Sequence, residues 1–319
     1  MRALVTGSTG FVGSALLQRL LARPDQTVVA ATRDAPERLP AAVERTCIAS
    51  LGPDTDWRRG LAGVDTVYHL AARVHVMHDT VTDPLAAFRQ TNVEGTLRLA
   101  RQAAQAGVRR FVFVSSIKVN GERTSAGQAF RADDVPAPMD PYGVSKLEAE
   151  QGLQRLASDT GLEVVIVRPP LVYGPGVKAN FLRMMNWLQQ GIPLPFGRID
   201  NKRSLVALDN LVDLLLVCGH HPDAAGQTFL ASDGSDLSTS ELLRLLSLAL
   251  GRPARLIPVP SPWLVVTFAA LGKRDLAQRL CESLQVDIAK TRQLLNWSPV
   301  IDAEAALGHT AKHFLELRH

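Results

Sequence analysis

Arg2-Ala-Leu-Val-Thr6, Gly7-Ser-Thr-Gly10-Phe-Val-Gly13 and Ser14-Ala-Leu-Leu-Gln-Arg-Leu-Leu21 open the chain in that order. The first stretch is a short apolar run typical of a buried strand, and the third has the pattern of an amphipathic helix. Glycines between them let the backbone approach a pyrophosphate, whose charge is attracted by the free N–H groups of a helix N-terminus. The G-x-x-G-x-x-G spacing, with these flanks, predicts a dinucleotide phosphate site.

Strand-like and helical runs alternate through the first half of the chain. We predict strands at residues 2–6, 27–32, 64–70, 111–115 and 163–168, and helices at 13–22, 84–106 and 142–158. Alternation of this kind is typical of an α/β protein with a parallel sheet covered on both faces, a doubly wound Rossmann-type fold. Such a sheet would hold the cofactor at the carboxyl ends of its strands.

The pattern loosens from about residue 171, where prolines become frequent. Helices remain plausible at about 178–190, 209–219, 238–250 and 302–317. We therefore expect a smaller, mixed C-terminal lobe that binds the substrate.

Ser115-Ser116 and Tyr142-Gly-Val-Ser-Lys146 supply a hydroxyl, a phenol and an amine that could act on one substrate oxygen. Residues four apart share one face of a helix, so the ammonium can favour the phenolate and lower a tyrosine pKa that is normally about 10. This arrangement suits proton transfer to or from a carbinol while a nicotinamide carries the hydride. The alternative is a surface helix after Pro141 with a solvated lysine.

Composition narrows the class of protein. Among 319 residues, 46% are hydrophobic and 21% charged, which is ordinary for a soluble globular protein. The net charge of +4 is small and its basic residues are scattered, so we expect no nucleic-acid partner. Cys47, Cys218 and Cys281 are far apart, which predicts a reduced, cytoplasmic compartment and no metal site. His220-His221 precedes a proline, where capping a helix is the expected role.

Two observations bear on membranes. The chain opens directly on its first strand, so we expect no signal peptide. Its most apolar stretch, Trp263-Leu-Val-Val-Thr-Phe-Ala-Ala-Leu271, is too short to span a bilayer and is interpreted as a buried helix. The alternative is a patch that faces a membrane.

The glycine turn, the Ser-Tyr-Lys set and three further motifs resemble the extended short-chain dehydrogenase/reductase superfamily, and within it the NAD-dependent epimerase/dehydratase branch that acts on nucleotide sugars. The three further motifs are Val67-Tyr-His-Leu-Ala-Ala72, Thr91-Asn-Val-Glu-Gly-Thr96 and Val167-Arg-Pro-Pro-Leu-Val-Tyr-Gly-Pro-Gly176. The match covers about the first 210 residues and continues more loosely to the end. Ser115-Ser-Ile-Lys-Val-Asn-Gly-Glu122 looks most like bacterial enzymes of surface-polysaccharide sugar synthesis.

The resemblance implies an organisation in space. The Rossmann domain would comprise residues 1–170 with a return at about 204–231, and the substrate-binding lobe would comprise residues 171–203 and 232–319. The helices at 84–106 and 142–158 match those that form a dimer interface in relatives, so we expect a homodimer.

The resemblance also assigns roles to single residues. Tyr142 would be the catalytic acid and base, Lys146 would lower its pKa and bind the nicotinamide ribose, and Ser116, not its neighbour Ser115, would position the substrate oxygen. His69 is expected to be packed and Asn92 to support the site. The expected cofactor-binding residues are Gly7, Thr9, Gly10, Phe11, Val12, Gly13, Arg33, Leu70, Ala71, Ala72, Asn92, Tyr142, Lys146 and Pro169. Those expected to bind substrate are Lys118, Asn180 and Arg203, the last as a clamp on the diphosphate.

The choice of cofactor depends on the end of the second strand, Thr32-Arg33-Asp34. NAD enzymes usually place an acidic residue there for the ribose hydroxyls, whereas Arg33, with Arg38, would accept a 2′-phosphate. We therefore favour NADP(H). A shift of one residue brings Asp34 into place and leaves NAD(H) possible.

These observations favour a nucleotide-sugar oxidoreductase that reduces a UDP-4-keto-(6-deoxy)hexose at C4. Arg33 suggests an exchangeable cofactor, and Leu171 departs from the asparagine that 4-epimerases carry near that position. The alternative is a UDP-hexose 4-epimerase with tightly bound NAD, which would use the same residues. Dehydration is disfavoured because Ile117-Lys118 stands where dehydratases carry Asp-Glu. A non-catalytic NADP-sensing protein is the rival from another class.

Overall fold

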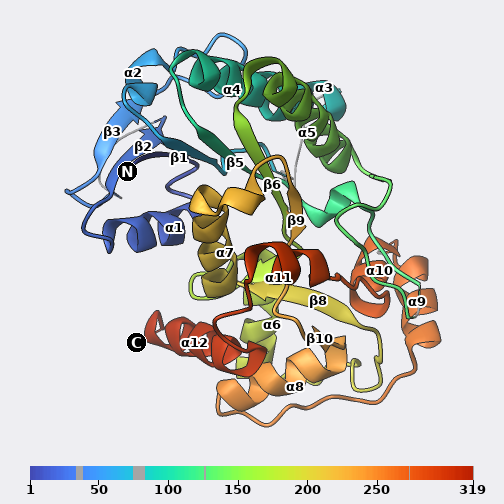
Figure 1. Ribbon diagram of the computed structural model, residues 1–319. Helices are drawn as coiled ribbons and strands as arrows, with labels where there is room; N and C mark the ends of the chain where they lie inside the picture. Colours follow the sequence, from blue (N-terminus) through green and yellow to red (C-terminus); the bar gives the residue numbers. More distant parts are fainter. Residues whose placement is uncertain (34–38, 75–82, 126, 273, 319) are drawn as a thin grey trace.

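Parallel strands form the central sheet of the computed structural model, which describes residues 1–33, 39–74, 83–125, 127–272 and 274–318 (Figure 1). Within these residues the sheet has seven strands, in the order β3 (Glu44–Cys47), β2 (Thr27–Thr32), β1 (Arg2–Thr6), β4 (Thr66–His69), β5 (Arg110–Val114), β6 (Glu163–Arg168) and β9 (Thr228–Leu230). From β1, the chain adds β2 and β3 on one side and then β4, β5 and β6 on the other. The gap between β1 and β4 is therefore the switch point, where doubly wound folds bind their ligands.

Alternate side chains of each strand enter the cores on the two faces of this sheet. Ala3 and Val5 of β1 belong to the core beneath α1 (Phe11–Leu21) and α7 (Leu208–His220). Leu4 belongs to the core beneath α2 (Arg58–Leu61), α4 (Thr96–Gln105) and α5 (Pro141–Thr160). Burial on both faces explains why the strands are continuous apolar runs rather than alternating ones.

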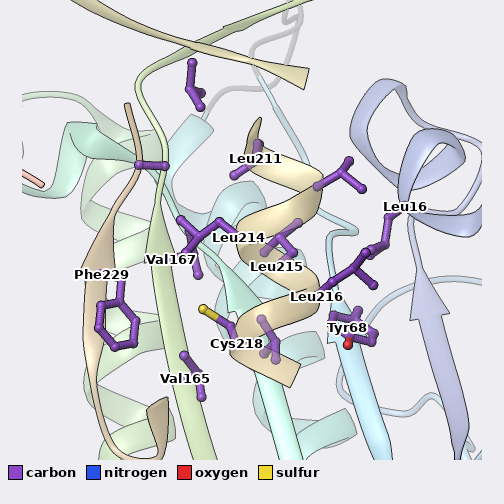
Figure 2. Close-up of a cluster of buried hydrophobic side chains, with 14 of the residues drawn as sticks. Leu16, Tyr68, Val165, Val167, Leu211, Leu214, Leu215, Leu216, Cys218 and Phe229 are labelled. Atoms are coloured by element: carbon purple, nitrogen blue, oxygen red, sulfur yellow. The ribbon is translucent and has the colours of Figure 1, made fainter. Parts of the chain in front are cut away.

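Helix α7 packs on the first face with most of its residues buried. Figure 2 shows it lying along the sheet, with Val165 and Val167 of β6 on one side and Tyr68 and Leu16 on the other. Its small residue Gly219 allows this approach, because a Cβ there would lie 1.9 Å from the Tyr68 hydroxyl oxygen.

The helix expected at 84–106 is broken into three parts. It begins as α3 (Pro84–Phe88), continues as the π-helix η2 (Arg89–Gly95) and ends as α4. π-helical turns are rare and often lie at functional sites.

A second, mixed sheet carries the smaller lobe. Its strands β10 (Asp236–Leu237), β8 (Arg203–Ala207) and β7 (Leu171–Tyr173) pair antiparallel and then parallel. The remaining helices are η3 (Ile117–Val119), α6 (Ala179–Gln189), η4 (Pro222–Ala224), α8 (Thr239–Ala249), α9 (Ser261–Ala270), α10 (Arg274–Cys281), α11 (Ala289–Leu295) and α12 (Ala303–Glu316). A third core lies between α6, α8, α12 and this sheet.

The expected fold class is confirmed: a Rossmann-type parallel sheet with a smaller mixed lobe. The stretch expected to return to the large sheet divides, because β8 joins the small sheet while α7 and β9 join the large one. Strand β3 was not predicted, since Glu-Arg-Thr-Cys lacks an apolar pattern and lies at the sheet edge. The division into domains and the homodimer through α4 and α5 stay predictions.

The interpretation of Trp263–Leu271 as a buried helix is wrong. The stretch forms most of helix α9 and ends at the residue that follows it, Leu271. Within α9 only Leu264 is buried, and Trp263 is 69% exposed. Among the described residues, no helix is both long and apolar enough to cross a membrane.

Substituting Gly219 with alanine tests the contact between α7 and the sheet. We expect Gly219→Ala to lower the free energy of unfolding by about 1–3 kcal/mol, because the new methyl group overlaps the buried Tyr68 ring. The matched control is Gly308→Ala in α12, where an added Cβ meets nothing within 4 Å. There the gain in helix propensity should raise stability by up to about 1 kcal/mol. Urea denaturation measures both, and equal effects would contradict the packing.

Candidate active site

The carboxyl ends of the parallel strands lie at one edge of the large sheet. Four of the sequence motifs reach such an end: Gly7 follows β1, Leu70 follows β4, Ser115 follows β5 and Pro169 follows β6. Residues that are far apart in the sequence are therefore brought to one place by the topology alone.

The glycine turn is too crowded for any side chain. Gly7 has φ +68°, and a Cβ on it would lie 2.8 Å from the backbone nitrogen of Ala71. A Cβ on Gly13 would lie 2.0 Å from the carbonyl oxygen of Gly7. Gly10 begins α1 with no side-chain cap and no acidic residue in the first turn, so the N–H groups of the helix start are left for another acceptor.

Thr6 and His69 fix the neighbouring loop. The Thr6 hydroxyl oxygen accepts hydrogen bonds from the backbone N–H groups of Leu70 (3.2 Å) and Ala71 (3.1 Å) and lies 2.7 Å from Nδ1 of His69. Burial, and then the nearby charge of Lys146, lowers the pKa of His69 to about 3. His69 is therefore a neutral packed residue, as expected, whose other nitrogen lies 2.9 Å from the Thr96 hydroxyl.

Asn92 on the π-helix joins this loop to the helix that carries Tyr142. Its amide accepts from the backbone N–H of Arg73 (2.8 Å) and donates to the carbonyl of Arg73 and to the Ser145 hydroxyl, both at 3.0 Å. Asn92 is buried, so these bonds satisfy its amide internally, and its part in cofactor binding stays a prediction.

A cavity of about 910 Å³ lies between the strand ends and the smaller lobe. Most of the predicted reacting and substrate-binding residues line it: Ser116, Lys118, Tyr142, Asn180 and Arg203, with Pro169 and Leu171 beside them. These residues come from η3, α5, α6, β8 and the end of β6. Both lobes therefore contribute to its wall. Lys146 lies beside Tyr142 but is not part of the lining.

The adjacent serines have different environments. Ser116 caps η3, accepts from the backbone N–H of Lys118 at 3.3 Å and lines the cavity. Ser115 is buried and bonds the Glu150 carboxylate, which also forms a two-pronged pair with Arg168 at 2.5–3.2 Å. Ser116 is thus the serine whose hydroxyl a substrate can reach.

Tyr142 and Lys146 lie side by side, with the ammonium 5.9 Å from the centre of the phenol ring. The Lys146 Nζ donates to the carbonyl of Val114 at 2.9 Å and lies 4.5 Å from the Phe113 ring centre. Burial lowers the pKa of Lys146 to about 7, against an opposing effect of Glu150. The site can therefore hold this amine in either protonation state near neutral pH.

The pKa of Tyr142 is raised, to about 12, rather than lowered as the sequence suggested. Burial is the main cause and the Asp140 carboxylate is the second, because both disfavour a phenolate. Tyr142 is thus a protonated phenol packed edge-on against Phe88, at 5.9 Å between ring centres. A protonated phenol is the form that donates a proton.

Lys118 is held in the cavity wall rather than extended into solvent. Its Nζ pairs with Asp140 and lies 3.1 Å from the Glu122 carboxylate. Asp140 also caps α5 by accepting from the backbone N–H of Gly143 at 2.6 Å, one residue beyond Tyr142. Lys118 thereby offsets a negative charge beside Tyr142, a contact that sequence reasoning did not foresee.

The far end of the cavity carries positive charge. Arg203 donates to the carbonyl of Glu282 at 3.0 Å, and burial lowers the pKa of its guanidinium. Arg183 and Arg279 line the same cavity and were missed in the sequence, because no motif marks them. Asn180 follows Ala179, whose φ of +55° is a strained backbone that starts α6 beside the cavity.

Arg33, which was expected to favour NADP over NAD, follows β2 directly. Arg33 is exposed there, and its carbonyl faces the Cys47 thiol at 3.8 Å. Asp34 and Arg38 lie outside the described residues. Across the described ranges, no three His, Cys, Asp or Glu side chains are grouped so as to hold a metal ion.

A family model and a curated relative both match nearly the whole chain or most of it. The model of the NAD dependent epimerase/dehydratase family matches residues 3–231. A Vibrio cholerae protein described as a UDP-glucose 4-epimerase is 47% identical over 315 residues, which cover 98% of this chain and 95% of that protein.

Two solved structures resemble this one over the full length of both chains. UDP-glucuronic acid 4-epimerase from Bacillus cereus in complex with NAD superposes with a TM-score of 0.81 at 22% identity, a likeness that shows the fold. MoeE5 in complex with UDP-glucose and NAD superposes with a TM-score of 0.78 at 25% identity.

The lowered pKa of Lys146 predicts a pH dependence of stability. Between about pH 7 and 10.5 the unfolded chain holds a proton on this lysine that the folded chain has lost, so stability rises with pH there. Below about pH 7 both states are protonated and the full cost of burying the charge remains. We expect the difference in unfolding free energy between the native chain and Lys146→Met to increase by about 1 kcal/mol per pH unit across this window.

Urea denaturation without added nucleotide measures this difference. It is repeated from pH 6 to 9 in steps of about one unit, because a single group titrates over about two pH units. A difference that stays constant over the series would contradict the assigned pKa.

Proposed function

The chain belongs to the NAD dependent epimerase/dehydratase family, and from that premise we propose that it is a UDP-hexose 4-epimerase that keeps NAD bound through its reaction. The observation that carries the proposal is the meeting of Ser116, Tyr142 and Arg203 in one cavity. The Vibrio cholerae relative described as a UDP-glucose 4-epimerase supports it along nearly the whole chain. These relatives favour the epimerase over net reduction, which the sequence had placed first.

The glycine turn suits a dinucleotide. Gly7 and Gly13 let the turn pack tightly against Ala71 and against itself, where a Cβ would overlap backbone atoms, and the uncapped start of α1 offers N–H donors to phosphate oxygens. The MoeE5 structure contains NAD, and the preference for NADP inferred from Arg33 finds no support in the relatives. When bound, NAD supplies reversible hydride acceptance at its nicotinamide.

The side chains of the cavity would transfer the proton and hold the substrate oxygen. The Tyr142 phenol is the group that moves the proton of the sugar 4-hydroxyl, and the Ser116 hydroxyl holds that oxygen by a hydrogen bond. Lys146, beside Tyr142, favours its phenolate whenever the amine is charged. The same phenol would return the proton to the 4-oxygen, and the configuration at C4 would invert if the 4-keto sugar turned its other face toward the nicotinamide.

The diphosphate would bind arginines of the cavity wall. Arg203, Arg183 and Arg279 line the cavity together with the acidic residues Glu122, Asp140 and Glu282, of which Glu122 and Asp140 are paired with Lys118. Guanidinium groups bind phosphate oxygens two at a time, so these arginines would fix the nucleotide while the sugar reaches Tyr142.

Net reduction of a 4-keto sugar is the second candidate, and one observation favours it. Leu171 lines the cavity with 51% of its surface exposed, where the 4-epimerases that this chain resembles carry an asparagine. An apolar contact there would suit a sugar that lacks a hydroxyl, such as a 6-deoxyhexose.

Tyr142→Phe tests the proposal. We expect the native chain to interconvert UDP-glucose and UDP-galactose with no added cofactor, and the variant to lose about 100- to 10,000-fold in kcat because the proton carrier is gone. Its nucleotide content, measured after denaturing release, should be unchanged.

Tyr68→Phe is the matched control, since Tyr68 packs against α7 away from the cavity and should leave kcat unchanged. No epimerisation by the native chain, together with oxidation of NADH or NADPH by a UDP-4-keto-6-deoxyhexose, would replace the epimerase by the reductase. Cofactor binding without turnover of either substrate would indicate the non-catalytic sensor.

A further inference from the structure

Lys118 connects the two segments that carry Ser116 and Tyr142. It lies on η3, two residues after Ser116, and its backbone N–H donates to the Ser116 hydroxyl at 3.3 Å. Its Nζ pairs with the carboxylate of Asp140, which is the N-cap of α5. One residue thus joins the loop of Ser116 to the start of the helix that carries Tyr142.

The backbones of the two segments are also in contact. A Cβ on Gly143 would lie 3.0 Å from the Lys118 carbonyl oxygen, so the start of α5 lies directly against η3. The Asp140 carboxylate accepts from the backbone N–H of Gly143 at 2.6 Å, which holds the first turn of α5 in place. Neither contact involves the Lys118 amine. The charge of that amine can therefore be removed while the two segments stay together.

Asp140 places a negative charge close to Tyr142. It lies two residues before Tyr142, its side chain is only 16% exposed, and both residues line the same cavity. A carboxylate with so little exposure is weakly screened by solvent. Burial raises the pKa of Tyr142 most, and the Asp140 charge raises it second. An unopposed Asp140 would leave still less phenolate, the form that accepts the proton of a hydroxyl.

The Lys118 amine is shared between two carboxylates of the cavity wall. It pairs with Asp140 and lies 3.1 Å from Glu122, whose side chain is 38% exposed. Asp140 is the less exposed of the two acids, and an ion pair away from solvent is stronger than one at the surface. Lys118 therefore acts mainly on the carboxylate that disfavours the phenolate of Tyr142.

Other charged groups also lie around Tyr142. The Lys146 ammonium on the same helix lies 5.9 Å from the centre of the phenol ring. Tyr142 packs on Phe88, and the Arg73 guanidinium lies 5.9 Å from the centre of that ring. The neighbouring elements and the cavity wall add the pairs Arg89–Glu148 and Arg168–Glu150, the neutral His69, and Arg183, Arg203, Arg279 and Glu282. These groups are left intact in the variants below and form a constant background.

We propose that Lys118 is a positioning residue for proton transfer, which holds and neutralises Asp140 so that its charge does not suppress the phenolate of Tyr142. The proposal rests on the proposed function, in which Tyr142 carries the proton of the sugar 4-hydroxyl. The balance of charge between Lys118 and Asp140 then sets the pH range in which Tyr142 works.

Titration of Tyr142 tests this without any turnover. The chain has 3 tyrosines, and labelling the ring carbon that bears the oxygen gives each one a carbon NMR signal. The signal of Tyr142 is the one lost in Tyr142→Phe. Tyr68 and Tyr173 are fully buried, and burial raises the pKa of both above that of Tyr142. Tyr142 should therefore ionise first, and unchanged signals from the other two show that the protein is still folded.

Four variants separate charge from contact. Lys118→Gln should raise the pKa of Tyr142 by about one unit, because Asp140 then acts unopposed. Asp140→Asn should lower it by about one unit, since asparagine still caps α5 but carries no charge. Combining the two changes should bring it back to within about 0.3 unit of the native value, because both charges are gone. Lys118→Arg, which keeps the charge, should titrate as the native chain does.

Turnover should follow the same balance of charge. Lys118→Gln should lower kcat/KM for UDP-glucose at neutral pH about three- to tenfold, because less phenolate is present. Lys118→Arg and the double variant should both recover most of that loss. A residue that only joined the two segments would not be replaced by removing its partner as well.

Lys290→Gln is the matched control. Lys290 pairs with Asp133 at 2.7 Å, and its side chain is 25% exposed against 27% for Lys118. Neither of these two described residues lines the cavity. The variant makes the same change of charge and should leave both the titration of Tyr142 and kcat/KM unchanged.

Two results would overturn the proposal. One is an unchanged titration of Tyr142 in Lys118→Gln, or an equal shift in Lys290→Gln. The other is a double variant as impaired as Lys118→Gln, which would make Lys118 a structural link between η3 and α5. Absence of epimerisation by the native chain, together with the expected shifts of Tyr142, would overturn the epimerase and leave the effect of Lys118 on Tyr142 standing.

Discussion

The buried pair of Arg168 and Glu150 is the interaction on which the site depends. Arg168 ends β6, Glu150 lies one turn after Lys146 on α5, and the same carboxylate bonds Ser115 at the end of β5. Arg168 also donates to Asn120 at 3.0 Å, which fixes the loop after Ser116. Removing one partner of such a pair leaves an uncompensated buried charge, at about 3–5 kcal/mol. One ion pair thus ties the ends of β5 and β6 to the turn of α5 that follows Lys146 and to the loop after Ser116.

The protonation states of Tyr142 and Lys146 depend on the side chains packed around them. Burial against Phe88 and the charge of Asp140 keep the phenol protonated, while burial brings the pKa of Lys146 to about 7. Lys118 moderates the effect of Asp140 by pairing with it. A protonated phenol with a titrating amine 5.9 Å from its ring centre suits reversible oxidation of a carbinol, and neither property comes from the tyrosine-lysine spacing alone.

The sequence predicts five strands of the large sheet, β1, β2, β4, β5 and β6, because each is a mostly apolar run buried on both faces. The structure brings the predicted residues Ser116, Tyr142 and Arg203 to one cavity, and their roles stay predictions. Sequence reasoning misses β3, an edge strand without apolar pattern, and it wrongly buries α9, because composition does not show which face of a helix finds a neighbour. It cannot foresee Arg183, Arg279 or the pair of Lys118 with Asp140, which depend on how the two lobes meet.

We propose that the hydride removed from sugar C4 returns to the same sugar within one turnover. The most direct test uses UDP-glucose that carries deuterium at C4, incubated with the protein without added cofactor. We expect UDP-galactose that retains the deuterium at C4, detected by mass and nuclear magnetic resonance. Loss of the label from C4, or its appearance in free reduced cofactor, would contradict return of the hydride to the same sugar.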